Sequence, residues 1–208
     1  MEFTLHYRGP LRATTTRNKR VSEKHALRKH FHVQLKALWN QKPLVEHSEF
    51  LQPGRETATG VVEPDEEGIG INFEDITLLR EVGSFQFVPT VSYELDMVAD
   101  LTITLLRPGP PGRIVSQGGD LDNRLKTLLD ALKVPSEAEL PSGATPTQEE
   151  SPFFCLVEDD ALITGLDIKT DRLLAPLEPT APDPSEVVLL IHTRTRLVAG
   201  NTANLGLV

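Results

Sequence analysis

The 208-residue sequence contains one cysteine, Cys155, and few aromatic residues, which make up 5% of the chain. A single cysteine excludes an internal disulfide framework and is typical of proteins from reducing compartments. No run of about eighteen apolar residues is present, which excludes a membrane-spanning helix. The first residues, MEFTLHYRGP, lack the basic and apolar regions of a secretory signal. These absences predict a cytoplasmic protein with no membrane partner.

Charge is distributed unevenly along the chain. The formal net charge is −9, but residues 1–43 carry ten Lys and Arg against two Glu. This segment therefore has a net charge of +8, while the rest of the chain has −17. Because local potential governs the encounter with a partner, the basic segment fits a polyanionic ligand. A solvated helix face explains the same charges equally well.

Hydrophobic periodicity predicts an α/β chain that forms one domain, 1–208. An apolar stripe predicts a helix from Ser22 to about residue 40, with its basic residues on the solvent side. A clean leucine stripe predicts a second helix over 121–133. Apolar or alternating segments predict strands at 2–8, 85–92, 94–106, 153–157, 161–169 and 186–193.

These elements predict a single mixed β-sheet with two main helices packed on it, an α+β arrangement. Pro89 places the strand at 85–92 at a sheet edge. Segments 43–83 and 134–152 have loop composition and are interpreted as insertions, and 197–208 as a flexible tail. Cys155 and Trp39 fall in apolar patterns and are predicted core residues.

Two acidic clusters are the most informative feature of the sequence. Asp120 and Asp122 lie where a loop enters the second predicted helix, and Asp122, Lys126, Asp130 and Lys133 share one stripe of that helix. The run Glu158-Asp159-Asp160 separates two predicted strands. Carboxylates brought together in this way provide the oxygen ligands that Mg²⁺ prefers, and a nearby lysine stabilises charge on a phosphate.

The same residues have a simpler interpretation. Asp120 or Asp122 can cap the helix, where a carboxylate is favourable. A Glu-Asp-Asp run is often a solvated turn. Spacing alone therefore leaves both a metal site and a purely structural role open.

The run Asp-Leu-Asp-Asn-x-x-Lys on a leucine-rich helix, followed by Asp-Asp-Ala before an apolar strand, resembles the RusA family of Holliday junction resolvases. The resemblance covers residues 95–193 and implies a RusA-like fold. It implies that Asp120, Asp122 and Asp160 bind metal and, with Lys126, are catalytic, while Asp159 matches an acidic neighbour. Gly118-Gly119 and the two insertions depart from the family pattern.

The function that the resemblance implies is a Mg²⁺-dependent endodeoxyribonuclease that resolves Holliday junctions or other branched DNA, with Mn²⁺ as a substitute metal. It also implies a homodimer and no organic cofactor. The alternatives are a nucleic-acid-binding module of the same fold without catalysis, and a protein–protein interaction domain. The predicted DNA contacts are Arg17, Lys19, Arg20, Lys24, Arg28, Lys29 and Lys169.

Overall fold

A computed structural model of the chain describes residues 1–15, 19–51, 56–65, 68–75, 77–108, 121–175, 183, 185–201, 203–204 and 206–207. Its largest sheet has four strands in the order β1 (Glu2–Pro10), β9 (Glu186–Leu197), β6 (Met97–Arg107) and β8 (Ile163–Arg172). β9 pairs antiparallel with both β1 and β6, and β8 pairs parallel with β6. β6 follows the predicted alternation, since Ala99, Leu101 and Ile103 are buried.

A second, three-stranded sheet corrects the prediction of a single sheet. It has the order β4 (Arg80–Val82), β5 (Phe85–Val91) and β7 (Phe153–Val157). β5 is therefore the central strand, although Pro89 was predicted at an edge. The proline is tolerated because β4 pairs only with Phe85–Phe87, so Pro89 lies past the end of β4.

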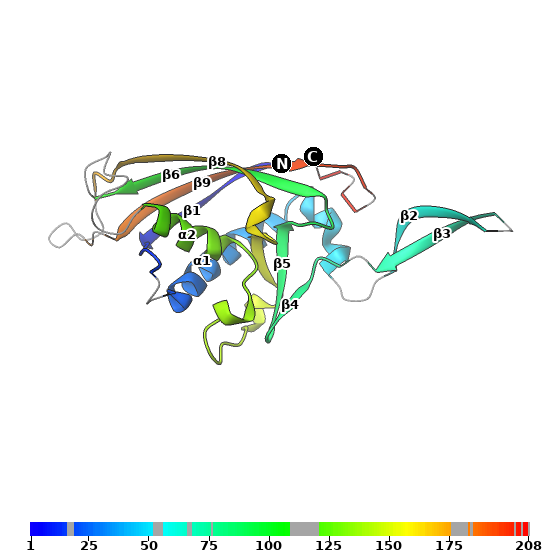
Figure 1. Ribbon diagram of the computed structural model, residues 1–208, viewed down its shortest axis with the longest axis horizontal. Helices are drawn as coiled ribbons and strands as arrows, with labels where there is room; N and C mark the ends of the chain where they lie inside the picture. Colours follow the sequence, from blue (N-terminus) through cyan, green and yellow to red (C-terminus); the bar gives the residue numbers. More distant parts are fainter. Residues whose placement is uncertain are drawn as a thin grey trace.

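Helices α1 (Val21–Trp39) and α2 (Leu121–Leu132) pack beneath the four-stranded sheet (Figure 1). The predicted stripes supply the core, because Leu27, Phe31 and Leu35 of α1 and Leu128 and Leu132 of α2 are buried. α1 also contacts β7 of the second sheet. The two helices thus join both sheets in one hydrophobic core. No helix in the described part of the chain is long and apolar enough to cross a membrane.

Segment 43–83 contains regular structure where the sequence predicted an irregular insertion. A 3₁₀ helix, η1 (Leu44–Leu51), follows α1. Strands β2 (Glu56–Asp65) and β3 (Gly68–Asp75) then form an antiparallel hairpin that projects away from the two helices (Figure 1).

Segment 134–152 is also more ordered than its composition suggests. It forms two 3₁₀ turns, η2 (Glu137–Glu139) and η3 (Gln148–Glu150), and each begins with a capping box. Ion pairs from Lys29 to Glu150 (2.8 Å) and from Lys36 to Glu149 (2.7 Å) fasten η3 to α1. Val134, Leu140 and Ala144 also pack against apolar residues of β5 and β7, so polar and apolar contacts together hold this segment.

Several residues of segment 197–208, which was predicted as a flexible tail, are buried. Ala203 and Leu207 are buried in the core. The Asn204 side chain donates hydrogen bonds to the carbonyl oxygens of Leu95 (2.9 Å) and Ala199 (2.8 Å). These contacts attach the end of the chain to the turn before β6.

Candidate functional site

Helix α2 presents the predicted stripe of polar residues beside its buried leucines. The segment before α1 runs along this helix, where the Thr14 amide donates to the Asn123 carbonyl oxygen (3.2 Å). The Thr127 hydroxyl donates to the Arg12 carbonyl oxygen (3.0 Å) on the same side. Lys126 and Asp130 lie at i and i+4, so they share one face of α2, and Lys133 follows directly after the helix.

That face forms the floor of a cavity of about 750 Å³. Its walls come from the segment before α1, the first turn of α1, the start of segment 134–152 and the turn after β7. The lining residues are Thr14, Thr15, Lys19, Val21, Lys24, Asn123, Lys126, Asp130, Lys133, Ser136, Ala138, Glu139 and Asp160. The cavity thus contains two of the predicted catalytic residues, Lys126 and Asp160, which come from distant segments. Two of the predicted DNA contacts, Lys19 and Lys24, also line it. Asp122 is exposed on α2 and does not line it.

A buried ion pair lies in the floor of the cavity. The Lys24 ammonium is 2.6 Å from an Asp130 carboxylate oxygen, and both side chains are almost fully buried. Arg28 is 1% exposed and donates to the Asp130 carbonyl oxygen (2.9 Å). The prediction that Lys24 and Arg28 lie on the solvent side of α1 is therefore wrong. Lys24 and Arg28 are buried because α2 packs against the basic side of α1. The apolar pattern of α1 alone does not show that a second helix covers this side.

Two of the three histidines of α1, His25 and His32, are buried. His32 accepts a hydrogen bond at Nδ1 from the Phe154 amide (2.9 Å), and its Nε2 lies 3.0 Å from the Glu149 carbonyl oxygen. Burial lowers the pKa of His32. Burial, together with Arg28 and Lys29, lowers the pKa of His25 to about 4. Both rings thus favour the neutral form and belong to the core.

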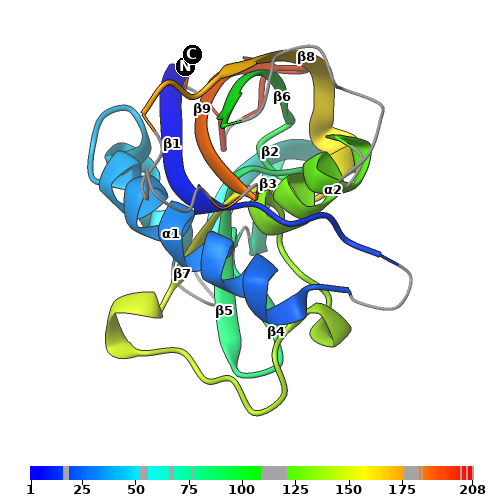
Figure 2. The same ribbon diagram turned by 90° about the vertical axis from the view of Figure 1, so that its left-hand side faces the viewer.

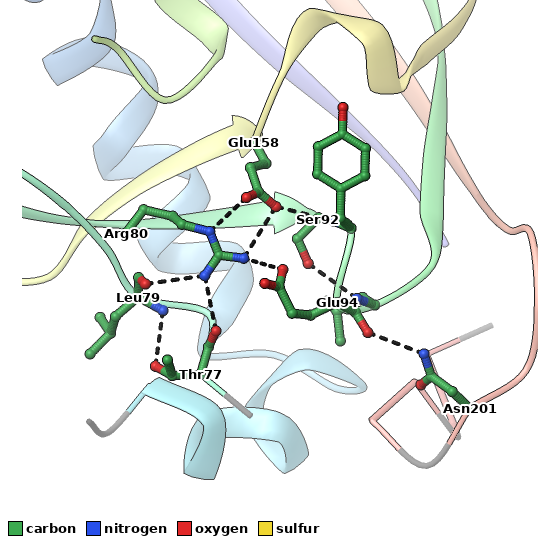
Figure 3. Close-up of polar contacts among 9 residues, drawn as sticks. Thr77, Leu79, Arg80, Ser92, Glu94, Glu158 and Asn201 are labelled. Atoms are coloured by element: carbon green, nitrogen blue, oxygen red, sulfur yellow. Dashed lines mark hydrogen bonds and ion pairs between the residues drawn. The ribbon is translucent and has the colours of Figure 1, made fainter. Parts of the chain in front are cut away.

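The acidic run after β7 is divided between three different environments. Glu158 turns toward β4, where it accepts hydrogen bonds from Arg80 Nε (2.6 Å) and the Tyr93 amide (3.1 Å). Figure 3 shows that the Arg80 guanidinium lies between Glu158 and Glu94. Arg80 also forms an ion pair with Glu94. Asp159 caps η4 (Asp160–Leu162) by accepting a hydrogen bond from the Ala161 amide (2.8 Å). That hydrogen bond holds the pKa of Asp159 below its usual range.

Asp160 alone of this run lines the cavity. Its carboxylate lies 3.7 Å from the Lys133 ammonium. Lys126 has no hydrogen-bond or ion-pair partner within the described residues. The cavity therefore contains the Asp160 carboxylate, paired with Lys133, and the Lys126 ammonium, which has no such partner among the described residues.

The donor chemistry of the predicted acids fits Mg²⁺, which prefers carboxylate oxygens and retains several waters. Asp122 and Asp160 lie in the described part of the chain, whereas Asp120 lies outside it. Within the described residues, no group of three His, Cys, Asp or Glu side chains comes together. Of the predicted metal ligands that the structure describes, Asp160 alone lines the cavity, so a site shared with Asp122 and Asp120 rests on the family resemblance and not on the described geometry.

The remaining predicted DNA contacts are scattered. Lys19 lines the cavity, Arg20 pairs with Glu23 (2.8 Å) and Lys29 pairs with Glu150. Lys169 is exposed on β8, 3.4 Å from Asp167, and does not line the cavity. Arg17 lies outside the described residues. Cys155 is buried and its pKa is raised to about 12 by burial, which agrees with its predicted place in the core.

The sequence did not single out Thr14, Ser136 or Glu139 as site residues. Thr14 lines the cavity because the segment before α1 runs along α2. Ser136 and Glu139 belong to segment 134–152, which has loop composition. No local pattern marks such residues, because only the packing of these segments against α2 brings them to the cavity. No family model, curated protein or solved structure matches the chain.

Proposed function

We propose that the chain is a Mg²⁺-dependent endonuclease that cuts Holliday junctions or other branched DNA, in the manner of the RusA family that its motifs resemble. The observation that most supports this proposal is the shared cavity of Lys126 and Asp160. These residues match two separate parts of the family motif, and a purely structural domain has no need to bring them together.

Each residue has a distinct role in this proposal. Asp120, Asp122 and Asp160 bind Mg²⁺, which when bound activates a water and neutralises charge on the phosphate. The Lys126 ammonium stabilises the negative charge that grows on the phosphate oxygens during cleavage. Lys133, beside Asp160, keeps this carboxylate turned toward the cavity.

A homodimer is part of the same proposal. Symmetric incision of a four-way junction requires two active sites that face opposed strands, which a two-fold dimer supplies. Light scattering at micromolar concentration is expected to give twice the 23.0 kDa mass of the chain. A strictly monomeric protein would contradict this part of the proposal.

The decisive experiment is a cleavage assay on labelled four-way junction, flap and linear duplex, with Mg²⁺ and with EDTA. We expect metal-dependent cleavage of the branched substrates and little cleavage of the linear duplex. Absence of cleavage on all substrates in Mg²⁺ and in Mn²⁺ would overturn the assignment.

A binding module without catalysis is the second candidate. It is favoured by one observation, that the described carboxylates do not form a group of three. Thermal unfolding distinguishes the two functions, because a ligand that binds the native state raises the midpoint. A midpoint raised by Ca²⁺ or Mg²⁺ supports the nuclease, whereas branched-DNA binding without any metal response supports the module.

A further inference from the structure

The two edges of the four-stranded sheet are covered differently. At the β1 edge, α1 lies beside the strand (Figure 2). Its Gln34 side chain accepts a hydrogen bond from the His6 amide (3.0 Å) and donates one to the His6 carbonyl oxygen (2.8 Å). At the opposite edge, no strand in the described part of the chain pairs with the outer side of the ten-residue strand β8. A long strand with such an edge is a template for pairing with another chain.

The hydrophobic core reaches the surface along β8. Leu166 pairs with Leu101 of β6 and therefore faces the same side of the sheet, toward the helices. Leu101 is 2% exposed, whereas Leu166 is 45% exposed. A groove of about 450 Å³ lies at this place, lined by Leu129 of α2, Asp160 and the beginning of β8. Because Asp160 also lines the cavity of Lys126, a partner that covers this side of β8 lies beside the candidate site.

The charges on the other face of β8 decide how it can pair with a second copy of itself. Two copies related by a two-fold axis perpendicular to the sheet pair antiparallel, and the residue at the axis lies opposite its own copy. Nearly the whole strand pairs when this residue is Asp167 or Ile168. With Asp167 at the axis, two carboxylates lie directly opposite each other, which is unfavourable. With Ile168 at the axis, each Asp167 lies opposite a Lys169, and Leu166 lies opposite Thr170.

We propose that two copies of the chain pair antiparallel through β8, with Ile168 at the two-fold axis, so that their four-stranded sheets become one continuous sheet. The proposal rests on the homodimer of the proposed function and adds the surface that forms it. Within one chain, the Lys169 ammonium lies 3.4 Å from Asp167 on the same strand, and the two side chains are 69% and 59% exposed. Such an exposed contact is weak, so each charge can also bind the opposite charge of the second copy. Burial of Leu166 on the other face of the sheet adds an apolar contribution.

The test measures the dissociation constant of the dimer by sedimentation of the full chain, without DNA and without metal. Asp167→Lys places two lysines opposite each other at both positions of the charge pair, and Lys169→Asp does the same with carboxylates. Each variant is expected to raise the dissociation constant about tenfold, because like charges directly opposite each other destabilise a strand pair. Glu81→Lys, at an exposed acid of β4, makes the same change of charge on the second sheet and should keep the wild-type constant.

Mixing the two variants separates the interface from a folding defect. In a mixed dimer, the two cations of the Asp167→Lys chain lie opposite the two carboxylates of the Lys169→Asp chain, so the mixture should dimerise at least as tightly as the wild type. A monomeric wild-type chain, wild-type constants for both single variants, or a mixture that stays monomeric would overturn the interface. Because DNA and metal are absent, a nuclease that dimerises through another surface and a β8 dimer without nuclease activity give different results.

Discussion

The Lys133 ammonium lies 3.7 Å from the Asp160 carboxylate and joins the end of α2 to the turn after β7. This contact spans two segments whose only shared sequence feature is charge. Asp160 lines the cavity that also contains Lys126, whereas Glu158 and Asp159 of the same acidic run make other contacts. Asp160 is thus the one member of this run that lines the cavity.

Substitutions at Asp160 and Lys126 should separate metal binding from catalysis. Asp160→Asn is expected to abolish the rise in unfolding midpoint caused by Mg²⁺ and, with it, junction cleavage. Lys126→Ala is expected to keep the Mg²⁺ response but reduce the cleavage rate about 10²–10³-fold, since it removes charge stabilisation only. Lys42→Gln, at an exposed lysine paired with Glu46, serves as the control. Wild-type cleavage by Asp160→Asn would remove this residue from the metal site.

The buried ion pair of Lys24 and Asp130 should contribute to the free energy of unfolding. Removing one partner leaves an uncompensated buried charge, so Lys24→Met or Asp130→Asn is expected to cost about 3–5 kcal/mol of unfolding free energy. The double variant should cost less than the sum of the two, because neither charge then remains. Urea unfolding of the three variants measures the coupling, and strictly additive losses would contradict a direct pair.

Residues with a clear period were predictable from the sequence. The leucine stripe of α2 and the alternation of β6 gave elements within a few residues of those in the structure, because one face of each is buried. The split into two sheets was not predictable. The split depends on which strands pair with each other. Pro89 predicted an edge strand, but β5 is central, and its proline lies beyond the last residue that pairs with the short β4.

The candidate site was only partly predictable for a similar reason. Lys126 and Asp160 stood out because of their motif, and Lys133 shared the stripe of Lys126. Arg28 looked like a surface residue, because a basic side chain between apolar ones ordinarily faces solvent. Its burial follows from the packing of α1 against α2, which no local pattern contains.

Stability should fall in mild acid because of buried histidines. His25 has a pKa lowered to about 4 by burial, Arg28 and Lys29, with a smaller opposing effect of Glu150. The unfolded chain binds this proton below about pH 6.5, whereas the folded chain binds it only near pH 4. The stabilisation is therefore complete above pH 6.5 and is lost as the pH falls toward 4, by an amount on the order of 2 kcal/mol.

His25→Phe tests this dependence and retains an aromatic ring beside Phe85 and Phe153. Its urea midpoint is expected to change less between pH 7 and pH 4.5 than that of the wild type, as the proton-linked loss is removed. His192→Gln, at an exposed ring on β9, is the control and should keep the wild-type profile. Identical profiles for His25→Phe and the wild type would exclude His25 as the source.

Segment 134–152 should be held in place by its capping boxes as well as by the packing of Val134, Leu140 and Ala144 against apolar residues of β5 and β7. The Glu150 carboxylate accepts a hydrogen bond from the Thr147 amide (3.0 Å) and pairs with Lys29 (2.8 Å), so Glu150→Ala removes a cap and the link to α1 together. We expect a loss of about 1 kcal/mol in unfolding free energy and faster amide exchange over 134–152. Glu137→Ala, on an exposed residue of η2, should change neither. If the wild-type segment already exchanges at the rate of an unstructured peptide, these contacts do not order it.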